Sequence, residues 1–175
     1  MQQRILVWLA VGGVAVCSLS ACKREGGGPS QGHLGNCADP ILLDGTTTLE
    51  TETTAGTQQT LSAADPTCLS VDTLGPERVY QVAVPGSGTT HLRVTVTPAE
   101  TPGPAAFDPV VYLMRDCVVP PVCVAAEDRR GGGSLEVVEH TNTTGLTEKL
   151  FVVVDGYDYQ PQGGSYRLAP EVLPQ

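Results

Sequence analysis

The feature that most constrains the fold is a series of short segments in which apolar and polar residues alternate. The clearest example is residues 91–97, whose apolar positions are Leu92, Val94 and Val96. A period of two residues is that of a β-strand with one buried face and one solvated face. No segment of the chain keeps the 3.6-residue period of an amphipathic helix, so the pattern predicts an all-β protein.

Further segments extend this prediction to about eight short strands. Residues 110–114 and 150–154 are continuous apolar runs, which indicate strands buried on both faces. The other expected strands are residues 41–43, 46–54, 78–84, 134–139 and 165–169. The first two of these are expected to pair as a hairpin across Asp44-Gly45. The 20 glycines and 14 prolines are spread between the segments as turns, which is typical of an antiparallel β-sandwich.

The order of short motifs along the chain resembles a known family. An alternating strand at residues 77–82 and another at 91–96 are followed by D-P-x-x-Y-L at residues 108–113. The pattern V-V-D-G at 153–156 and G-S-Y-x-L at 164–168 closes the series. This order resembles the bacterial pre-peptidase C-terminal (PPC) domain, a module attached to secreted proteases and surface proteins. The resemblance implies a jelly-roll-like β-sandwich. No peptidase domain precedes it here, so a role as accessory to an attached enzyme does not carry over directly.

The N-terminal residues predict export. Arg4 precedes 12 apolar residues, 5–16, which is too short for a bilayer span of about 20 residues and fits a secretory signal peptide. The sequence Leu19-Ser20-Ala21-Cys22 then resembles the bacterial lipobox. The resemblance implies that Cys22 receives a diacylglycerol thioether, becomes the N-terminus after cleavage and is acylated with palmitate or a similar chain. Lys23 stands where inner-membrane lipoproteins often carry aspartate, which favours the outer membrane.

These observations divide the chain into three parts. Residues 1–21 are expected to be a lipoprotein signal peptide, residues 22–36 the lipidated cysteine with a glycine-rich tether, and residues 37–175 a PPC-like β-sandwich domain. The expected location is the bacterial cell envelope, lipid-anchored in the outer membrane and either periplasmic or surface-exposed. A net charge of −9 and a pI near 4.6 argue against nucleic acid as a partner.

The cysteines support the same location. Of the six, Cys17 lies in the signal peptide and Cys22 is the lipidation site. An even number of remaining cysteines in an exported domain predicts two disulfides, formed by Cys37, Cys68, Cys117 and Cys123. Three connectivities are open. Pairing between neighbours, Cys37–Cys68 and Cys117–Cys123, is favoured, because the second pair closes a short loop that two prolines stiffen.

The sequence holds few residues that indicate a site. It lacks a metalloprotease histidine pair, a nucleophile elbow and a phosphate-binding glycine loop, so we expect no catalytic residues and no required cofactor. Asp155 and Asp158 share a turn after a buried strand and Asp108 precedes another, which makes these three carboxylates candidate calcium ligands. Tyr157 and Tyr159 in the same turn are a candidate aromatic pair for a protein or carbohydrate ligand.

The sequence therefore predicts a membrane-anchored lipoprotein that presents a non-catalytic β-sandwich for binding a protein or carbohydrate, or for envelope structure. The alternative function is a hydrolase, or an accessory subunit of a secreted protease or hydrolase.

Overall fold

The computed structural model describes residues 33–63, 68–69, 71–103, 105–129, 131–157 and 163–174. These residues form nine β-strands and no helix, which confirms the predicted all-β fold. The strands are β1 (Ile41–Leu43), β2 (Leu49–Thr53), β3 (Arg78–Val84), β4 (Thr90–Pro98), β5 (Pro109–Met114), β6 (Cys123–Glu127), β7 (Glu136–Asn142), β8 (Glu148–Gly156) and β9 (Ser165–Pro174). A search of the described residues for a helix long and apolar enough to span a bilayer finds none. The expected signal peptide, Cys22 and the tether as far as residue 32 lie outside these residues.

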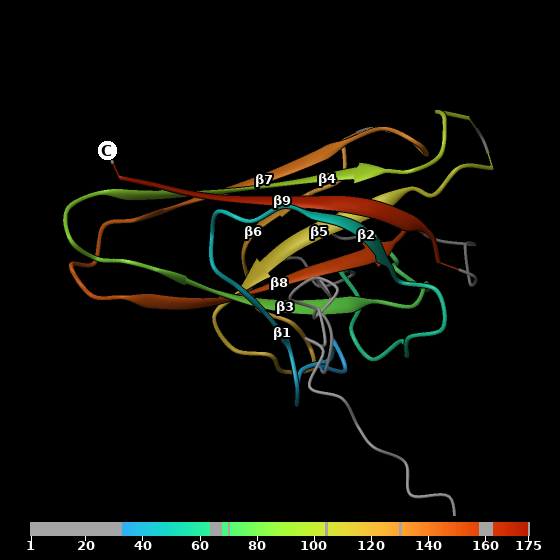
Figure 1. Ribbon diagram of the computed structural model, residues 1–175. Coiled ribbons are helices and arrows are strands. Elements are labelled where there is room, and N and C mark those ends of the chain that lie inside the picture. The colour runs from blue at the N-terminus through green and yellow to red at the C-terminus, as the bar shows by residue number, and fades with distance from the viewer. Residues whose placement is uncertain are drawn as a thin grey trace, which may run out of the picture.

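The strands form two sheets that pack face to face, as Figure 1 shows. The five-stranded sheet has the order β1-β3-β8-β5-β6, and the four-stranded sheet has the order β2-β9-β4-β7. All neighbouring strands are antiparallel except β1 and β3, which run parallel. The molecule is therefore a β-sandwich, as the sequence predicts, with one parallel pair at the edge of the five-stranded sheet.

The main core lies between the two sheets. In β4 the alternating residues Leu92, Val94 and Val96 are fully buried, and the polar residues between them lie on the outer face of the four-stranded sheet. From the other sheet, β3 contributes Tyr80 and Val82 to the same cluster. The predicted alternation of buried and solvated residues in residues 91–97 is confirmed. Burial of each of these aliphatic side chains contributes about 1.5–3 kcal/mol.

A second apolar cluster lies on the outer face of the five-stranded sheet. β5 is buried at every position, and β8 is largely so, which confirms that both strands bury two faces. The cluster comprises Leu61, Ala63, Val79, Val110, Tyr112, Met114 and Val153. The first two of these residues come from the connection between β2 and β3, which covers the face as far as it is described. We call this connection, residues 54–77, the covering segment (Figure 1).

The expected hairpin across Asp44-Gly45 is wrong, because β1 pairs with β3 while β2 pairs with β9 in the other sheet. The Asp44 carboxylate accepts hydrogen bonds from the backbone N–H groups of Thr46 at 2.8 Å and Thr47 at 2.7 Å. Gly45 has a φ of 79°, and its carbonyl accepts a bond of 2.8 Å from the backbone of Val172 in β9. Aspartate and glycine form a corner here that takes the chain from one sheet to the other.

Sequence patterning does not predict β6. Its five residues, Cys-Val-Ala-Ala-Glu, do not alternate, and all of them are partly exposed. β6 is the edge strand of the five-stranded sheet and pairs with β5. Because strand propensity depends strongly on neighbouring strands, a short edge strand of small residues leaves little trace in its own sequence.

The favoured disulfide pairing is also wrong. Cys37 is bonded to Cys117 and Cys68 to Cys123, with sequence separations of 80 and 55 residues. All four cysteines pack against the cluster on the outer face of the five-stranded sheet. Cys117 and Cys123 stand at the two ends of the β5–β6 connection, and each meets a different partner there. The disulfides therefore fasten the N-terminal segment and the covering segment to this connection.

A buried chain of hydroxyl groups joins the two sheets through the main core. The Tyr80 hydroxyl of β3 donates to the Glu52 carboxylate of β2 at 3.0 Å and lies 2.6 Å from the Tyr166 hydroxyl of β9. Burial raises the pKa of Tyr80 well above its ordinary value, so the phenol stays protonated and can donate. Glu52 and Tyr166 face each other in the register of β2 and β9. The Tyr80 hydroxyl of the five-stranded sheet thus forms hydrogen bonds with two polar groups of the other sheet, the Glu52 carboxylate and the Tyr166 hydroxyl.

We predict that peptide mapping without reduction will link Cys37 to Cys117 and Cys68 to Cys123. Replacing one pair, as in C68S/C123S, should lower the free energy of unfolding in urea by about 4 kcal/mol on the chain-entropy account of a loop this long. The C37S/C117S variant is expected to lose a similar amount. A peptide that joins Cys117 to Cys123 would contradict the pairing.

We predict that Tyr80→Phe lowers the free energy of unfolding by about 1–3 kcal/mol, because it leaves a buried carboxyl one hydrogen bond short. Chemical denaturation measures the change. Tyr157→Phe is the matched control, since that tyrosine is 41% exposed and its hydroxyl can bond to water. Equal stability of Y80F and Y157F would show that the hydroxyl of Tyr80 contributes nothing to stability.

Candidate functional site

The predicted calcium residues lie where β5 begins and β8 ends. These ends are neighbours, since Pro109 pairs with Gly156 and the Tyr157 N–H donates to the Asp108 carbonyl at 2.9 Å. Asp158 and Tyr159 lie outside the described residues. The backbone therefore brings Asp108 and Asp155 to the same end of two neighbouring inner strands of the five-stranded sheet.

Asp155 is fully buried within the second apolar cluster. Its carboxylate accepts hydrogen bonds from the Gly156 N–H at 2.7 Å and from the Tyr112 hydroxyl at 3.4 Å. The Thr73 hydroxyl is a third donor to it. The pKa of Asp155 is raised to about 7, because burial and, to a smaller extent, the nearby charge of Glu77 outweigh these three hydrogen bonds, which lower it. Asp155 thus binds the covering segment to β8 instead of reaching into the turn.

Asp108 has different neighbours. Burial, followed by the charges of Asp128 and Glu136, raises the pKa of Asp108 to about 6. Burial also raises the pKa of Asp128. Within the described ranges, no three histidine, cysteine, aspartate or glutamate side chains are arranged to hold a metal ion. Asp108 and Asp155 therefore sit among separate sets of charges, and the calcium site stays a prediction that involves Asp158.

Tyr157 is the described half of the candidate aromatic pair. Its side chain is 41% exposed, which leaves part of the ring open to a ligand. Its backbone forms an isolated bridge with Thr73 of the covering segment. The residue is therefore fixed in position next to β8, and its ring is presented at the surface.

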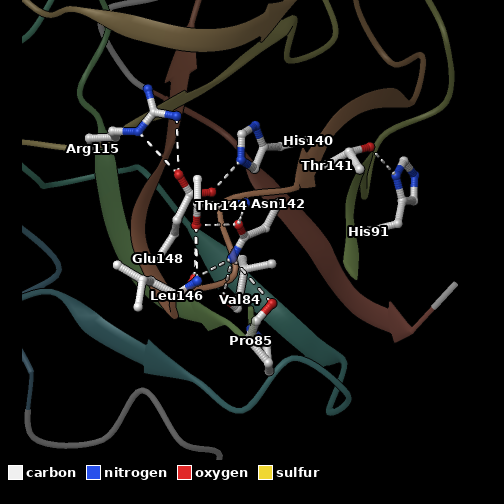
Figure 2. A network of polar contacts seen from close by, with 10 residues as sticks. All are labelled: Val84, Pro85, His91, Arg115, His140, Thr141, Asn142, Thr144, Leu146 and Glu148. Carbon is white, nitrogen blue, oxygen red and sulfur yellow. Dashed lines mark hydrogen bonds and ion pairs between the residues drawn. The ribbon is translucent and has the colours of Figure 1, made fainter. Parts of the chain in front are cut away.

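The structure groups polar residues that the sequence does not bring together. His140 of β7 contacts Glu148 of β8 through Nε2 and Oε2 at 2.7 Å, and Arg115 reaches the same carboxylate at 3.1 Å (Figure 2). The side chains of His140 and Glu148 are only 13% and 11% exposed. The hydrogen bond from His140, followed by that from Arg115, lowers the pKa of Glu148. Because β7 and β8 belong to different sheets, this cluster closes one end of the sandwich.

The next residues of the same network hold the turn between β7 and β8. The buried Asn142 amide donates to the carbonyls of Val84, Pro85 and Leu146 at 2.9, 3.1 and 2.8 Å. Its oxygen accepts from Thr144. Figure 2 shows these bonds converging on Asn142, while His91 lies apart with Thr141. Residues 142–144 therefore begin a turn that the buried Asn142 side chain stabilises, and these polar groups have a structural role.

A hollow of about 540 Å³ lies where the described chain begins. Its lining includes Glu77, Arg78, Thr60 and His33. The Glu77 carboxylate accepts from the backbone N–H and the hydroxyl of Thr60, and burial raises the pKa of Glu77. Arg78 donates from Nε to the carbonyl of Thr53 at 2.8 Å. Through these hydrogen bonds, Glu77 and Arg78 connect the end of the covering segment to its first half and to the residue just before it.

Comparisons with known proteins find similarity among solved structures. No family model and no curated protein matches the sequence. Among solved structures, the chain is similar to the pre-peptidase C-terminal domain of collagenase from Bacillus anthracis, with 14% identity and a TM-score of 0.47. The match covers 74% of this chain and 92% of that one. The β-sandwich itself is established by the strands and sheets described above.

We predict that Asp155 makes folding pH-dependent. The pKa of about 7 in the folded protein exceeds the ordinary value of about 3.9, so the folded state binds the proton more tightly. The contribution of Asp155 to the free energy of unfolding is complete below about pH 4 and is lost as the pH rises to about 7. Asp155→Asn should therefore gain stability relative to the parent by up to about 1 kcal/mol per pH unit over that range. Urea unfolding between pH 4 and 8 measures the difference.

Asp39→Asn is the matched control for this measurement. The hydrogen bond from His33, followed by the backbone bond from Leu34, lowers the pKa of Asp39, so its contribution is lost in acid instead. Because that loss occurs below about pH 4, the difference between D39N and the parent should stay nearly constant from pH 4 to 8, whereas D155N should diverge from the parent as the pH rises. A constant difference between D155N and the parent from pH 4 to 8 would contradict the assignment.

Proposed function

We propose that the protein is a lipid-anchored envelope protein in which a non-catalytic β-sandwich is presented for binding. The observation that supports it best is the pairing of all four cysteines outside residues 1–22 into two disulfides. Disulfides persist in oxidising compartments, which include the bacterial periplasm and the cell surface. The pairing thus agrees with export by the expected signal peptide and leaves Cys22 for the lipid.

The proposed anchor is a lipidated Cys22 in the outer membrane. Two or three acyl chains give stable membrane attachment, whereas a single chain gives only marginal binding. The described chain begins at His33, which contacts Asp39 at 2.7 Å, and Cys37 is bonded to Cys117. A tether of about ten residues would therefore join the membrane directly to a cross-linked part of the sandwich.

The proposed ligand is a protein or a carbohydrate, with Tyr157 as a contact. An exposed tyrosine can stack on a sugar or anchor a protein partner through both its ring and its hydroxyl. The buried carboxylates and the His140–Glu148 pair have partners inside the protein, as described above. Binding at the surface is therefore the function that these residues support best.

We predict that Cys22→Ser abolishes lipid attachment. In bacteria that express the full chain and are fed an alkyne-tagged fatty acid, the parent should carry the tag and sediment with membranes, whereas C22S should carry none. Cys17→Ser is the matched control, since it removes another cysteine of the same N-terminal region and should leave labelling unchanged. Labelling of C22S, or an unlabelled parent, would overturn the anchor. Turnover of peptide or glycoside substrates by the purified chain would overturn the non-catalytic role.

A further inference from the structure

The most exposed apolar stretch of the described residues lies between β5 and β6, in residues 117–123, which end at the first residue of β6 and which we call the apolar loop. Val118, Val119 and Val122 are 47%, 71% and 58% exposed. Both ends of the loop are cross-linked, because Cys117 is bonded to Cys37 and Cys123 to Cys68. The three valines are therefore held in water by a rigid support, which lowers the entropic cost of binding through them.

Other exposed apolar residues lie on the same side of the sandwich. Leu34 precedes the first disulfide, and Leu74 belongs to the covering segment; they are 69% and 50% exposed. Leu42 of β1 is 53% exposed and lies between two core residues, so it points to the outer face of the five-stranded sheet. The remaining large exposed apolar residues among those described are Leu135, Leu146, Tyr157 and Leu173. A concentration of exposed apolar side chains on one side marks an interaction surface.

The chain also enters the fold on this side. Gly35 lies two residues before Cys37. Its carbonyl accepts a hydrogen bond of 2.8 Å from the backbone N–H of Val79 near the start of β3. In Figure 1 the first described residues and the connection after β5 lie on the outer side of the five-stranded sheet, away from the other sheet. Cys22 precedes His33 by 11 residues, a length that spans at most about 36–40 Å in any conformation. A lipid on Cys22 would therefore keep the point where the chain enters the fold, on this side of the sandwich, within that distance of the membrane.

We propose that the apolar loop docks on the lipid surface that holds the anchor and inserts Val118, Val119 and Val122 among the headgroups. The inference rests on the proposed lipidation of Cys22. The patch is small, and alone it would bind a membrane weakly. The tether makes docking intramolecular, and the resulting effective concentration allows a weak contact to be occupied. Docking gives the sandwich a defined orientation, with the four-stranded sheet facing away from the membrane.

The test uses single tryptophans in the full chain. The only native tryptophan, Trp8, precedes Cys22, so cleavage would remove it, and the unsubstituted chain gives its background. Val119→Trp places the probe in the apolar loop, and Leu173→Trp is the matched control on β9, where the native side chain is 50% exposed. Each chain is reconstituted in vesicles of phosphatidylethanolamine and phosphatidylglycerol with brominated acyl chains. Flotation of the vesicles reports anchoring, and tryptophan emission reports insertion.

We expect V119W to shift its emission to the blue and to be quenched by the brominated lipid, while L173W shows neither change. Adding Val118→Ser and Val122→Ser to V119W should reduce the quenching and leave flotation unchanged. If both chains float with the vesicles but V119W and L173W show equal emission and quenching, the docking of the apolar loop would be overturned and the lipid anchor would stand. If the brominated lipid quenches V119W but the chain does not float with the vesicles, the anchor would be overturned and the apolar loop would remain a lipid contact. A blue shift without lipid quenching, growing with protein concentration, would assign the loop to a second copy of the chain and overturn the proposal.

Discussion

The apolar outer face of the five-stranded sheet is the constraint on which most other features of the structure depend. β5 and β8 bury side chains on both faces, so two sheets alone would leave Tyr112 and Val153 in water. The covering segment removes them from water, yet its described part forms no regular strand pairing with this sheet, apart from the isolated bridge between Thr73 and Tyr157. The Cys68–Cys123 disulfide holds the covering segment where regular strand hydrogen bonds do not, and Cys37–Cys117 holds the N-terminal segment beside it.

The same constraint explains the buried carboxyls. A cover made of irregular backbone has N–H and hydroxyl groups that need partners away from water. Glu77 accepts from the backbone and side chain of Thr60, and Asp155 accepts from Thr73. Their raised pKa values follow from burial and reflect a cost of placing acids beneath the cover. These carboxyls hold the protein together, which is why Asp155 is not presented to a ligand.

The strands could be predicted from the sequence because a period of two residues is a local signal. Residues 78–84 match β3 at both ends, and the burial of residues 110–114 on two faces follows from composition alone. The disulfide pairing and the corner at Gly45 could not be predicted in this way. Both depend on which segments meet across the fold, as Gly45 meets Val172 and Cys37 meets Cys117. The His140–Glu148 contact joins strands of different sheets, so no spacing in the sequence indicates it.

The position of the last two strands determines when the fold can form. β8 is the middle strand of the five-stranded sheet, and β9 lies between β2 and β4 in the other sheet. Until β8 and β9 have been synthesised, both sheets lack an inner strand, and their other strands cannot all pair as in the native fold. Native pairing is therefore non-local and has to wait for almost the whole polypeptide, which slows folding. Such a delay agrees with the proposed export, because early structure would obstruct the passage of an unfolded chain across a membrane.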